Sequence, residues 1–116
     1  MTKDYRDLSV WQKAMDFCVE VYALVRKLPT TETYALGDQM RRAAVSVPSN
    51  IAEGNGRGAK AEYARFLAIA RGSLLEVRTQ LELAERLGYF TVAQKLWDDI
   101  DDISKMLYSL IAKLRG

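Results

Sequence analysis

Few side chains in this sequence could carry out chemistry, and the most versatile one is missing. The 116 residues include no histidine, which removes the commonest general base, most zinc sites and the Glu-x-x-His pairs of di-iron bundles. Cys18 is the one cysteine, so it has no histidine to activate it and no partner for an internal disulfide. We interpret it as a small core residue. The sequence therefore predicts no enzyme activity, no metal and no cofactor.

Acidic side chains raise two further possibilities. Carboxylate-only catalysis could use Glu53, Glu76 or Glu82, but glutamates on a helical bundle are commonly ion-paired instead. The four aspartates between residues 98 and 102 could form a metal cluster, but carboxylates around Ile100 on a helix point in different directions. We interpret these aspartates as a solvated acidic face.

Basic side chains give the strongest local charge signal. Between Arg57 and Arg78 the sequence has five bases and two acids, although the whole chain carries a formal charge of only +2. A local patch could therefore contact phosphates where the overall charge would not. The candidate nucleic-acid-binding residues are Arg41, Arg42, Arg57, Lys60 and Arg65. The alternative is that the same arginines form structural ion pairs.

Three glycines follow Glu53, in the run Gly54-Asn55-Gly56-Arg57-Gly58. Such a run could form a phosphate-cradling loop, or it could end a helix and form a turn. A phosphate loop needs a preceding strand and a lysine-serine or lysine-threonine pair at the start of the next helix. The sequence shows neither feature, so we favour the end of a helix followed by a turn.

The composition predicts one all-α domain covering residues 1–116. With 49% hydrophobic and 28% charged residues, a chain of this length can bury an adequate core. The two prolines and the scarcity of β-branched alternation argue against a sheet. The single cysteine, and an N-terminus without a continuous apolar run, predict a cytoplasmic protein with no signal peptide, transmembrane span or membrane partner.

Apolar residues at alternating spacings of four and three predict four helices. The helices should cover about residues 8–28, 33–53, 59–87 and 91–114. The first and fourth each carry a second apolar row that an isolated bundle would leave partly exposed. These rows are Trp11, Met15, Cys18, Tyr22 and Val25, and Trp97, Tyr108 and Ile111. We therefore predict a closed homo-oligomer.

The second predicted helix contains Pro48, which lacks an N–H and clashes with the carbonyl of Ala44. A new helix beginning at Asn50 would reach Gly54 within one turn, and so short a helix nucleates poorly. We therefore predict one helix that bends at Pro48, ends at Glu53 and is stopped by Gly54. Short polar side chains suited to bonding the freed carbonyls lie nearby, at Ser46, Ser49 and Asn50.

The third predicted helix has a row of small residues away from its core seam. The row consists of Ala61, Ala64, Ala68 and Gly72. Because Gly72 destabilises a helix by roughly 1 kcal/mol relative to alanine, we expect another helix to pack closely against it. Arg71 and Arg78 lie between two apolar faces. We expect their stems to cover the core and their guanidinium groups to meet carboxylates, with Glu53 as one candidate.

Three stretches of the sequence resemble the bacterial four-helix bundle proteins of the 23S rRNA intervening-sequence family. They are DLSVWQKA (residues 7–14), QMRRAAVSVPSNIAEG (residues 39–54) and RFLAIARGSL (residues 65–74). The resemblance implies an up-down antiparallel four-helix bundle that assembles as a homopentamer. It also extends to the accessory proteins of diversity-generating retroelements, which bind a reverse transcriptase and nucleic acid. It implies no catalytic residues.

Two functions from different classes follow from these observations. One is a nucleic-acid-binding accessory protein, in which the basic residues form a patch that binds RNA or single-stranded nucleic acid and is repeated around a ring. The other is an oligomeric scaffold that binds a protein partner, such as a reverse transcriptase, with the arginines serving as structural ion pairs. Local charge favours the first.

Overall fold

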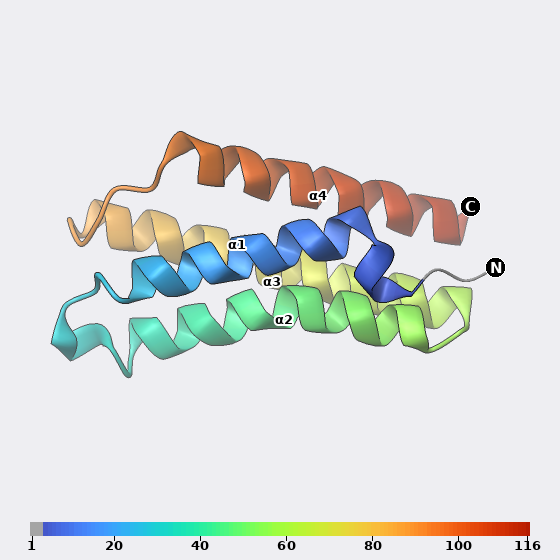
Figure 1. Cartoon of the computed structure of the whole chain (residues 1–116), viewed down its shortest axis with the longest axis horizontal. Coiled ribbons are helices and arrows are strands. Elements are labelled where there is room, and N and C mark those ends of the chain that lie inside the picture. The colour runs from blue at the N-terminus through green and yellow to red at the C-terminus, as the bar shows by residue number, and fades with distance from the viewer. Residues whose placement is uncertain (1–3) are drawn as a thin grey trace.

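Four α-helices dominate the computed structural model, which describes residues 4–116 (Figure 1). Residues 1–3 of the predicted domain lie outside the described part. The helices are α1 (Ser9–Val25), α2 (Leu36–Gly56), α3 (Lys60–Arg86) and α4 (Gln94–Arg115). Two single-turn 3₁₀ helices, η1 (Tyr5–Asp7) and η2 (Thr30–Glu32), precede α1 and α2. The predicted all-α, four-helix fold is confirmed.

The helices lie side by side along the long axis of a molecule measuring 46 × 25 × 20 Å, and consecutive helices run in opposite directions (Figure 1). α2 packs against α1 and α3, and α4 packs against α3 and α1. The order around the bundle is therefore α1, α2, α3, α4. The α2–α3 turn lies at one end with η1 and the C-terminal end of the chain, whereas the other two connections lie at the opposite end (Figure 1).

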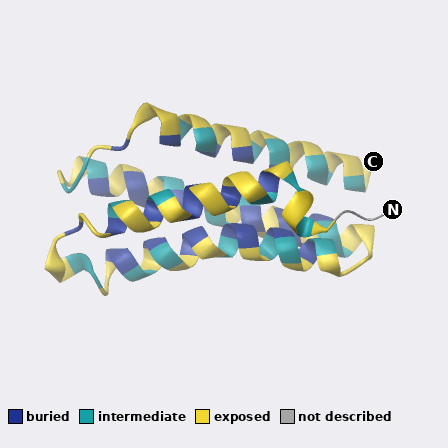
Figure 2. Ribbon diagram, in the orientation of Figure 1, coloured by how far each residue is buried: buried dark blue, intermediate teal, exposed yellow. Residues whose placement is uncertain are grey.

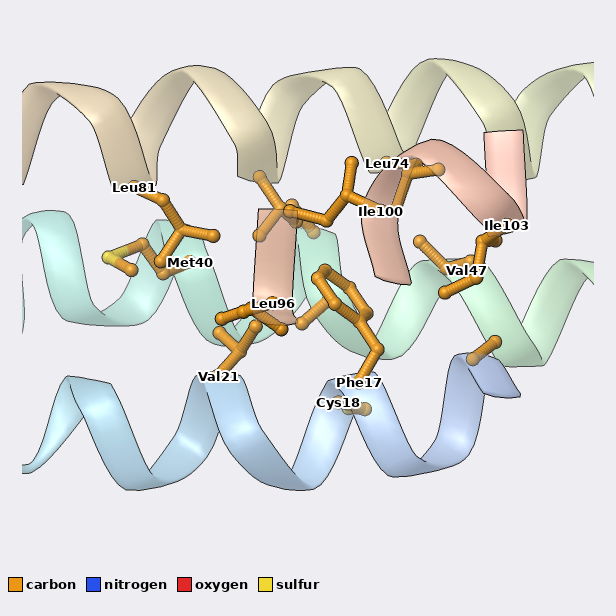
Figure 3. Close-up of a cluster of buried hydrophobic side chains, with 14 of the residues drawn as sticks. Phe17, Cys18, Val21, Met40, Val47, Leu74, Leu81, Leu96, Ile100 and Ile103 are labelled. Atoms are coloured by element: carbon orange, nitrogen blue, oxygen red, sulfur yellow. The ribbon is translucent and has the colours of Figure 1, made fainter. Parts of the chain in front are cut away.

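The core is a continuous apolar column to which all four helices contribute. Buried positions recur on one side of each helix and exposed positions on the other (Figure 2), as the spacings of four and three predict. Figure 3 shows side chains from the four helices converging in this column, including Phe17, Met40, Leu74, Leu81 and Ile100. Each of these five is at most 1% exposed. None of the helices in residues 4–116 is both long and apolar enough to cross a membrane.

The second helix differs from the prediction at both ends. α2 begins three residues late, because Thr30 and Thr31 belong to η2. It then passes through Pro48 and Gly54 and ends at Gly56. Gly54 is not a helix stop: a Cβ built on it would lie 2.7 Å from the Cβ of Phe66 in α3. The absence of a side chain at Gly54 therefore lets α2 and α3 approach closely.

Short polar side chains link α2 and α3 next to Pro48. Asn50 donates from Nδ2 to the carbonyl oxygen of Ser46 at 2.8 Å and to its Oγ at 2.9 Å. The hydroxyl of Ser46 in turn lies 2.8 Å from that of Ser73 in α3. The carbonyl that accepts this hydrogen bond therefore belongs to Ser46. The carbonyl that loses its donor because Pro48 has no N–H is that of Ala44, two residues earlier.

The third helix does not use its small residues as predicted. Gly72 is exposed, and a Cβ built on it would have no neighbour within 4 Å. Of the other small residues in the row, Ala64 is buried whereas Ala61 and Ala68 are exposed. The predicted close packing of another helix on Gly72 is therefore wrong within this chain.

The two arginines between the apolar faces of α3 reach α4. Arg78 donates to Asp101 at 2.7 Å and lies over the ring of Trp97. Arg71 meets no carboxylate among residues 4–116; its Nε lies 3.3 Å from the Ser104 hydroxyl, and its guanidinium lies over the ring of Tyr108. The prediction of a carboxylate partner is therefore right for Arg78 and wrong for Arg71. Glu53, the suggested candidate, pairs with Arg57 instead.

Candidate nucleic-acid interface

The α2–α3 turn is shorter than the glycine run suggests. Asn55 and Gly56 form the last turn of α2, and α3 begins at Lys60. Within this turn, only Gly58 has a positive φ, at 83°, a backbone conformation that favours glycine over any residue with a side chain. The turn therefore holds no extended loop that could surround a phosphate. It places Arg57 at the end of one helix and Lys60 at the start of the next.

Phe66 contacts the guanidinium groups of Arg57 and Arg65 at this turn. Its side chain is buried under Gly54, and two guanidinium groups lie over its ring, with Cζ at 5.0 Å for Arg57 and 4.7 Å for Arg65. Cation–π contact of this kind contributes about 0.5–1 kcal/mol at an exposed site. The stacking limits where these two flexible side chains can lie, and it leaves guanidinium N–H groups directed at the solvent.

Two glutamates partly neutralise these cations. Arg57 pairs with Glu53 at 2.8 Å, and Arg65 pairs with Glu62 at 3.0 Å. The hydrogen bond from Arg65, together with its charge, holds the pKa of Glu62 below its ordinary value, and the same bond raises the pKa of Arg65. Both groups therefore stay charged near neutral pH. In the described part of the chain, Lys60 has no such carboxylate partner.

Arg41 and Arg42 do not join this cluster. Arg42 precedes Arg57 by 15 positions on α2, which corresponds to roughly 22 Å along a helix. Arg41 is partly buried, pairs with Asp38 and donates to the carbonyl of Thr33 at 2.9 Å. Its role is therefore to fix the start of α2. The structure brings together Arg57, Lys60 and Arg65 of the predicted patch, and separates Arg41 and Arg42 from them.

Two basic residues that the sequence analysis did not select lie at the same end of the bundle. Lys113 and Arg115 belong to the last turn of α4, whose C-terminus lies at the end that holds the α2–α3 turn (Figure 1). Alternation of helix direction could have indicated this proximity. Bases are common in the last turn of a helix because they complement its dipole, so Lys113 and Arg115 alone did not indicate a binding site. The basic end is defined here as Arg57, Lys60, Arg65, Lys113 and Arg115.

At the opposite end of the bundle, carboxylates bond to the α1–α2 and α3–α4 connections. Tyr89, after α3, donates its hydroxyl to Glu32 of η2 at 2.9 Å, and this hydrogen bond raises the pKa of Tyr89. Glu85 accepts from the backbone N–H of Val92 at 2.7 Å, ahead of α4. The fourth helix was predicted from about residue 91, but α4 begins at Gln94, after Ala93, without a side-chain cap. The molecule is therefore basic at one end and linked by acidic side chains at the other.

An apolar groove runs between α1 and α2, on the side of the bundle away from the α3–α4 contact. Its volume is about 660 Å³. The residues lining it include Trp11, Met15, Val19, Tyr22, Val45 and Pro48. Val19 is 68% exposed. Four of the five residues in the second apolar row predicted for the first helix therefore line an open groove, whereas the fifth, Val25, is buried in the core.

Comparisons with known proteins place the chain among helical proteins without an assigned activity. A sequence model of the family described as 23S rRNA-intervening sequence protein matches residues 6–109. The chain is also similar to the crystal structure of a protein of unknown function from the S23 ribosomal protein family of Bacteroides thetaiotaomicron VPI-5482. The two share 28% sequence identity with a TM-score of 0.79, over 89% of this chain and 95% of the other. No curated protein matches the sequence.

Proposed function

The chain belongs to the 23S rRNA-intervening sequence protein family, and from this premise we propose that it is a non-catalytic, homo-oligomeric protein that binds RNA or single-stranded nucleic acid. The basic end makes the contact. The observation that carries the proposal is the placement of five bases at one end of the bundle, two of them stacked on Phe66.

The chemistry of the basic end suits phosphate oxygens better than base edges. Each guanidinium has five N–H donors, and the ion pairs of Arg57 and Arg65 with glutamates use only some of them. Lys60 adds a mobile ammonium group at the start of α3. Contacts of this kind position a strand without reading its sequence. The expected binding is therefore weak and largely independent of sequence.

Self-association compensates for the modest charge of each copy. Glu53 and Glu62 offset two of the five bases, so one protomer has little excess positive charge. A ring repeats the basic end, and several weak contacts to one strand raise the overall affinity without new chemistry. The resemblance to pentameric members of the family implies five copies.

The test is fluorescence anisotropy with a labelled single-stranded RNA over a series of salt concentrations. Binding should fall steeply with salt because neutralised phosphates release counterions. The triple variant Arg57→Glu, Lys60→Glu and Arg65→Glu should weaken binding by about tenfold or more at low salt. Its matched control applies the same charge change towards the other end of the bundle, at Lys27, Arg42 and Arg86, and should stay within about twofold of the parent.

Both triple variants should keep the helicity and oligomeric state of the parent, since all six side chains lie at exposed positions. No binding at low salt, or equal loss in the two triple variants, would count against the basic end.

A second candidate function is an oligomeric scaffold for a protein partner. The apolar groove favours it, as do the carboxylate partners that the structure gives to Arg41, Arg57 and Arg65. The resemblance to accessory proteins of diversity-generating retroelements makes a reverse transcriptase the partner to test. Titration of a labelled reverse transcriptase with the protein, without nucleic acid, distinguishes the two functions. Binding that survives the triple reversal at the basic end would support the scaffold.

A further inference from the structure

We propose that copies of this chain associate head to tail, so that the apolar groove between α1 and α2 of one copy covers a ridge between α3 and α4 of the next. The ridge is defined as Leu75, Tyr108 and Trp97 with Arg71 and Arg78. The proposal rests on the self-association in the proposed function and assigns the two surfaces that meet.

The groove is one half of the contact. Met15, Val19 and Tyr22 of α1 face Val45 and other α2 residues across it, and each of these side chains is more than a third exposed. Tyr5 packs edge-on against Trp11 at a ring separation of 5.2 Å and closes one end. An exposed apolar concavity of this size is typical of a surface that another protein covers.

The ridge is the other half. Leu75 is 48% exposed and Tyr108 is 62% exposed. Arg71 and Arg78 lie four residues before and three residues after Leu75, and therefore share its face of α3. Arg71 lies over Tyr108 and Arg78 lies over Trp97. These contacts limit where the two aromatic rings can lie, so the ridge is preorganised.

The two surfaces lie on opposite sides of the protomer, because the helices follow one another around the bundle in chain order. Groove-to-groove pairing would produce a dimer and leave the ridge exposed. Groove-to-ridge pairing covers both surfaces in every copy, and contacts between different patches close into a ring when the rotation allows it.

Charge favours a second copy of the chain as the partner that covers the groove, and it indicates how the two copies are oriented. The groove carries Arg26 at the end near η2, with no carboxylate partner in the described residues. On α3, Glu82, which pairs with Arg86 at 2.8 Å within its own copy, lies seven residues after Leu75, on the same face and towards that same end of the molecule. Parallel alignment of neighbouring copies brings Arg26 to Glu82. It also places every basic end on one face of the ring.

Cross-linking tests the pairing directly. In a Cys18→Ala background, the double variant Val19→Cys and Leu75→Cys is treated with a bismaleimide shorter than the 20 Å smallest extent of the bundle. Head-to-tail contact joins every interface, so a denaturing gel should show a ladder ending at the full ring. The two single-cysteine variants, which place a thiol on only one of the two surfaces, should stay uncross-linked.

The alternatives give different results. Dimers from Val19→Cys alone would mean groove-to-groove pairing and would overturn the proposal. An oligomeric parent whose double variant does not cross-link would overturn the pairing of these surfaces and leave self-association intact. A monomeric parent in light scattering would overturn the self-association itself.

A pair of point variants with Cys18 intact provides a second test. Val19→Asp places a charge in the groove and should weaken self-association by about tenfold or more. Ile69→Asp is the matched control: Ile69 is 41% exposed, and it lies three residues after Phe66 and four before Ser73, which both contact α2, so it shares their side of α3 and is outside both surfaces. It should leave the molar mass in solution unchanged. Equal effects of the two variants would contradict the assignment of the groove.

Discussion

At the scale of single residues, two glycines exchange the roles that sequence reasoning gave them. Gly54 was expected to stop a helix, and it instead lets α3 approach α2. Gly72 was expected to allow such an approach, and it faces open space. Both expectations used the general properties of glycine, which permit either role. Only the position of Phe66, twelve residues further along the chain than Gly54, determines which role applies.

Alanine substitutions at these two glycines should therefore have opposite effects. Gly54→Ala should lower the free energy of unfolding by about 1–3 kcal/mol, because the new Cβ collides with the Cβ of Phe66 and two helices must separate. Gly72→Ala should raise it by about 0.5–1 kcal/mol through better helix propensity. Urea denaturation at one protein concentration measures both. A Gly54→Ala midpoint equal to that of the parent would show that the two helices can separate at little cost.

At the scale of the helices, the apolar spacing predicted all four elements, whereas their ends depended on contacts between segments distant in sequence. α3 agrees with its prediction to within one residue at each end. α2 does not, because a 3₁₀ turn, η2, precedes it, and because Gly54 is used for packing. The partners of Arg71 on α4 could not be predicted, since a helical wheel gives the side of a helix and not the residue opposite it.

The contact between α3 and α4 offers a prediction at this scale. Arg78 and Asp101 form an ion pair whose side chains are 41% and 52% exposed. A double-mutant cycle with alanine at both positions should give a coupling of about 0.2–1 kcal/mol. Arg78→Ala should destabilise the protein more than Asp101→Ala, because it also removes the contact with Trp97. The reverse order would mean that the aromatic contact contributes nothing.

At the scale of the whole molecule, the sequence was sufficient for the fold class and insufficient for the distribution of charge. The candidate patch combined Arg41 and Arg42 with Arg57 because they are close in sequence, yet a single helix separates them along its length. Lys113 joins the patch from the far end of the chain because alternating helices return to the same end (Figure 1). Distance along the bundle axis, rather than along the chain, decides which bases lie together.

Self-association predicts a thermal midpoint that depends on protein concentration. Species that bind only the folded form stabilise it by mass action. A hundredfold rise in concentration should therefore raise the midpoint by roughly 5–10 °C for a chain of this size. Differential scanning calorimetry of the parent and of Val19→Asp compares the two cases, and the variant should show a smaller shift. A parent midpoint independent of concentration would indicate that unfolding does not involve dissociation.

The position of Cys18 in the wall of the groove gives the molecule an internal kinetic reporter. Cys18 is 9% exposed, and burial raises the pKa of its thiol, so it reacts slowly with alkylating reagents while it stays covered. Because the chain has no other thiol, the rate of modification at saturating reagent equals the rate at which Cys18 opens to the solvent. Lifetimes of this opening, from seconds to hours, can therefore be measured on the unaltered protein.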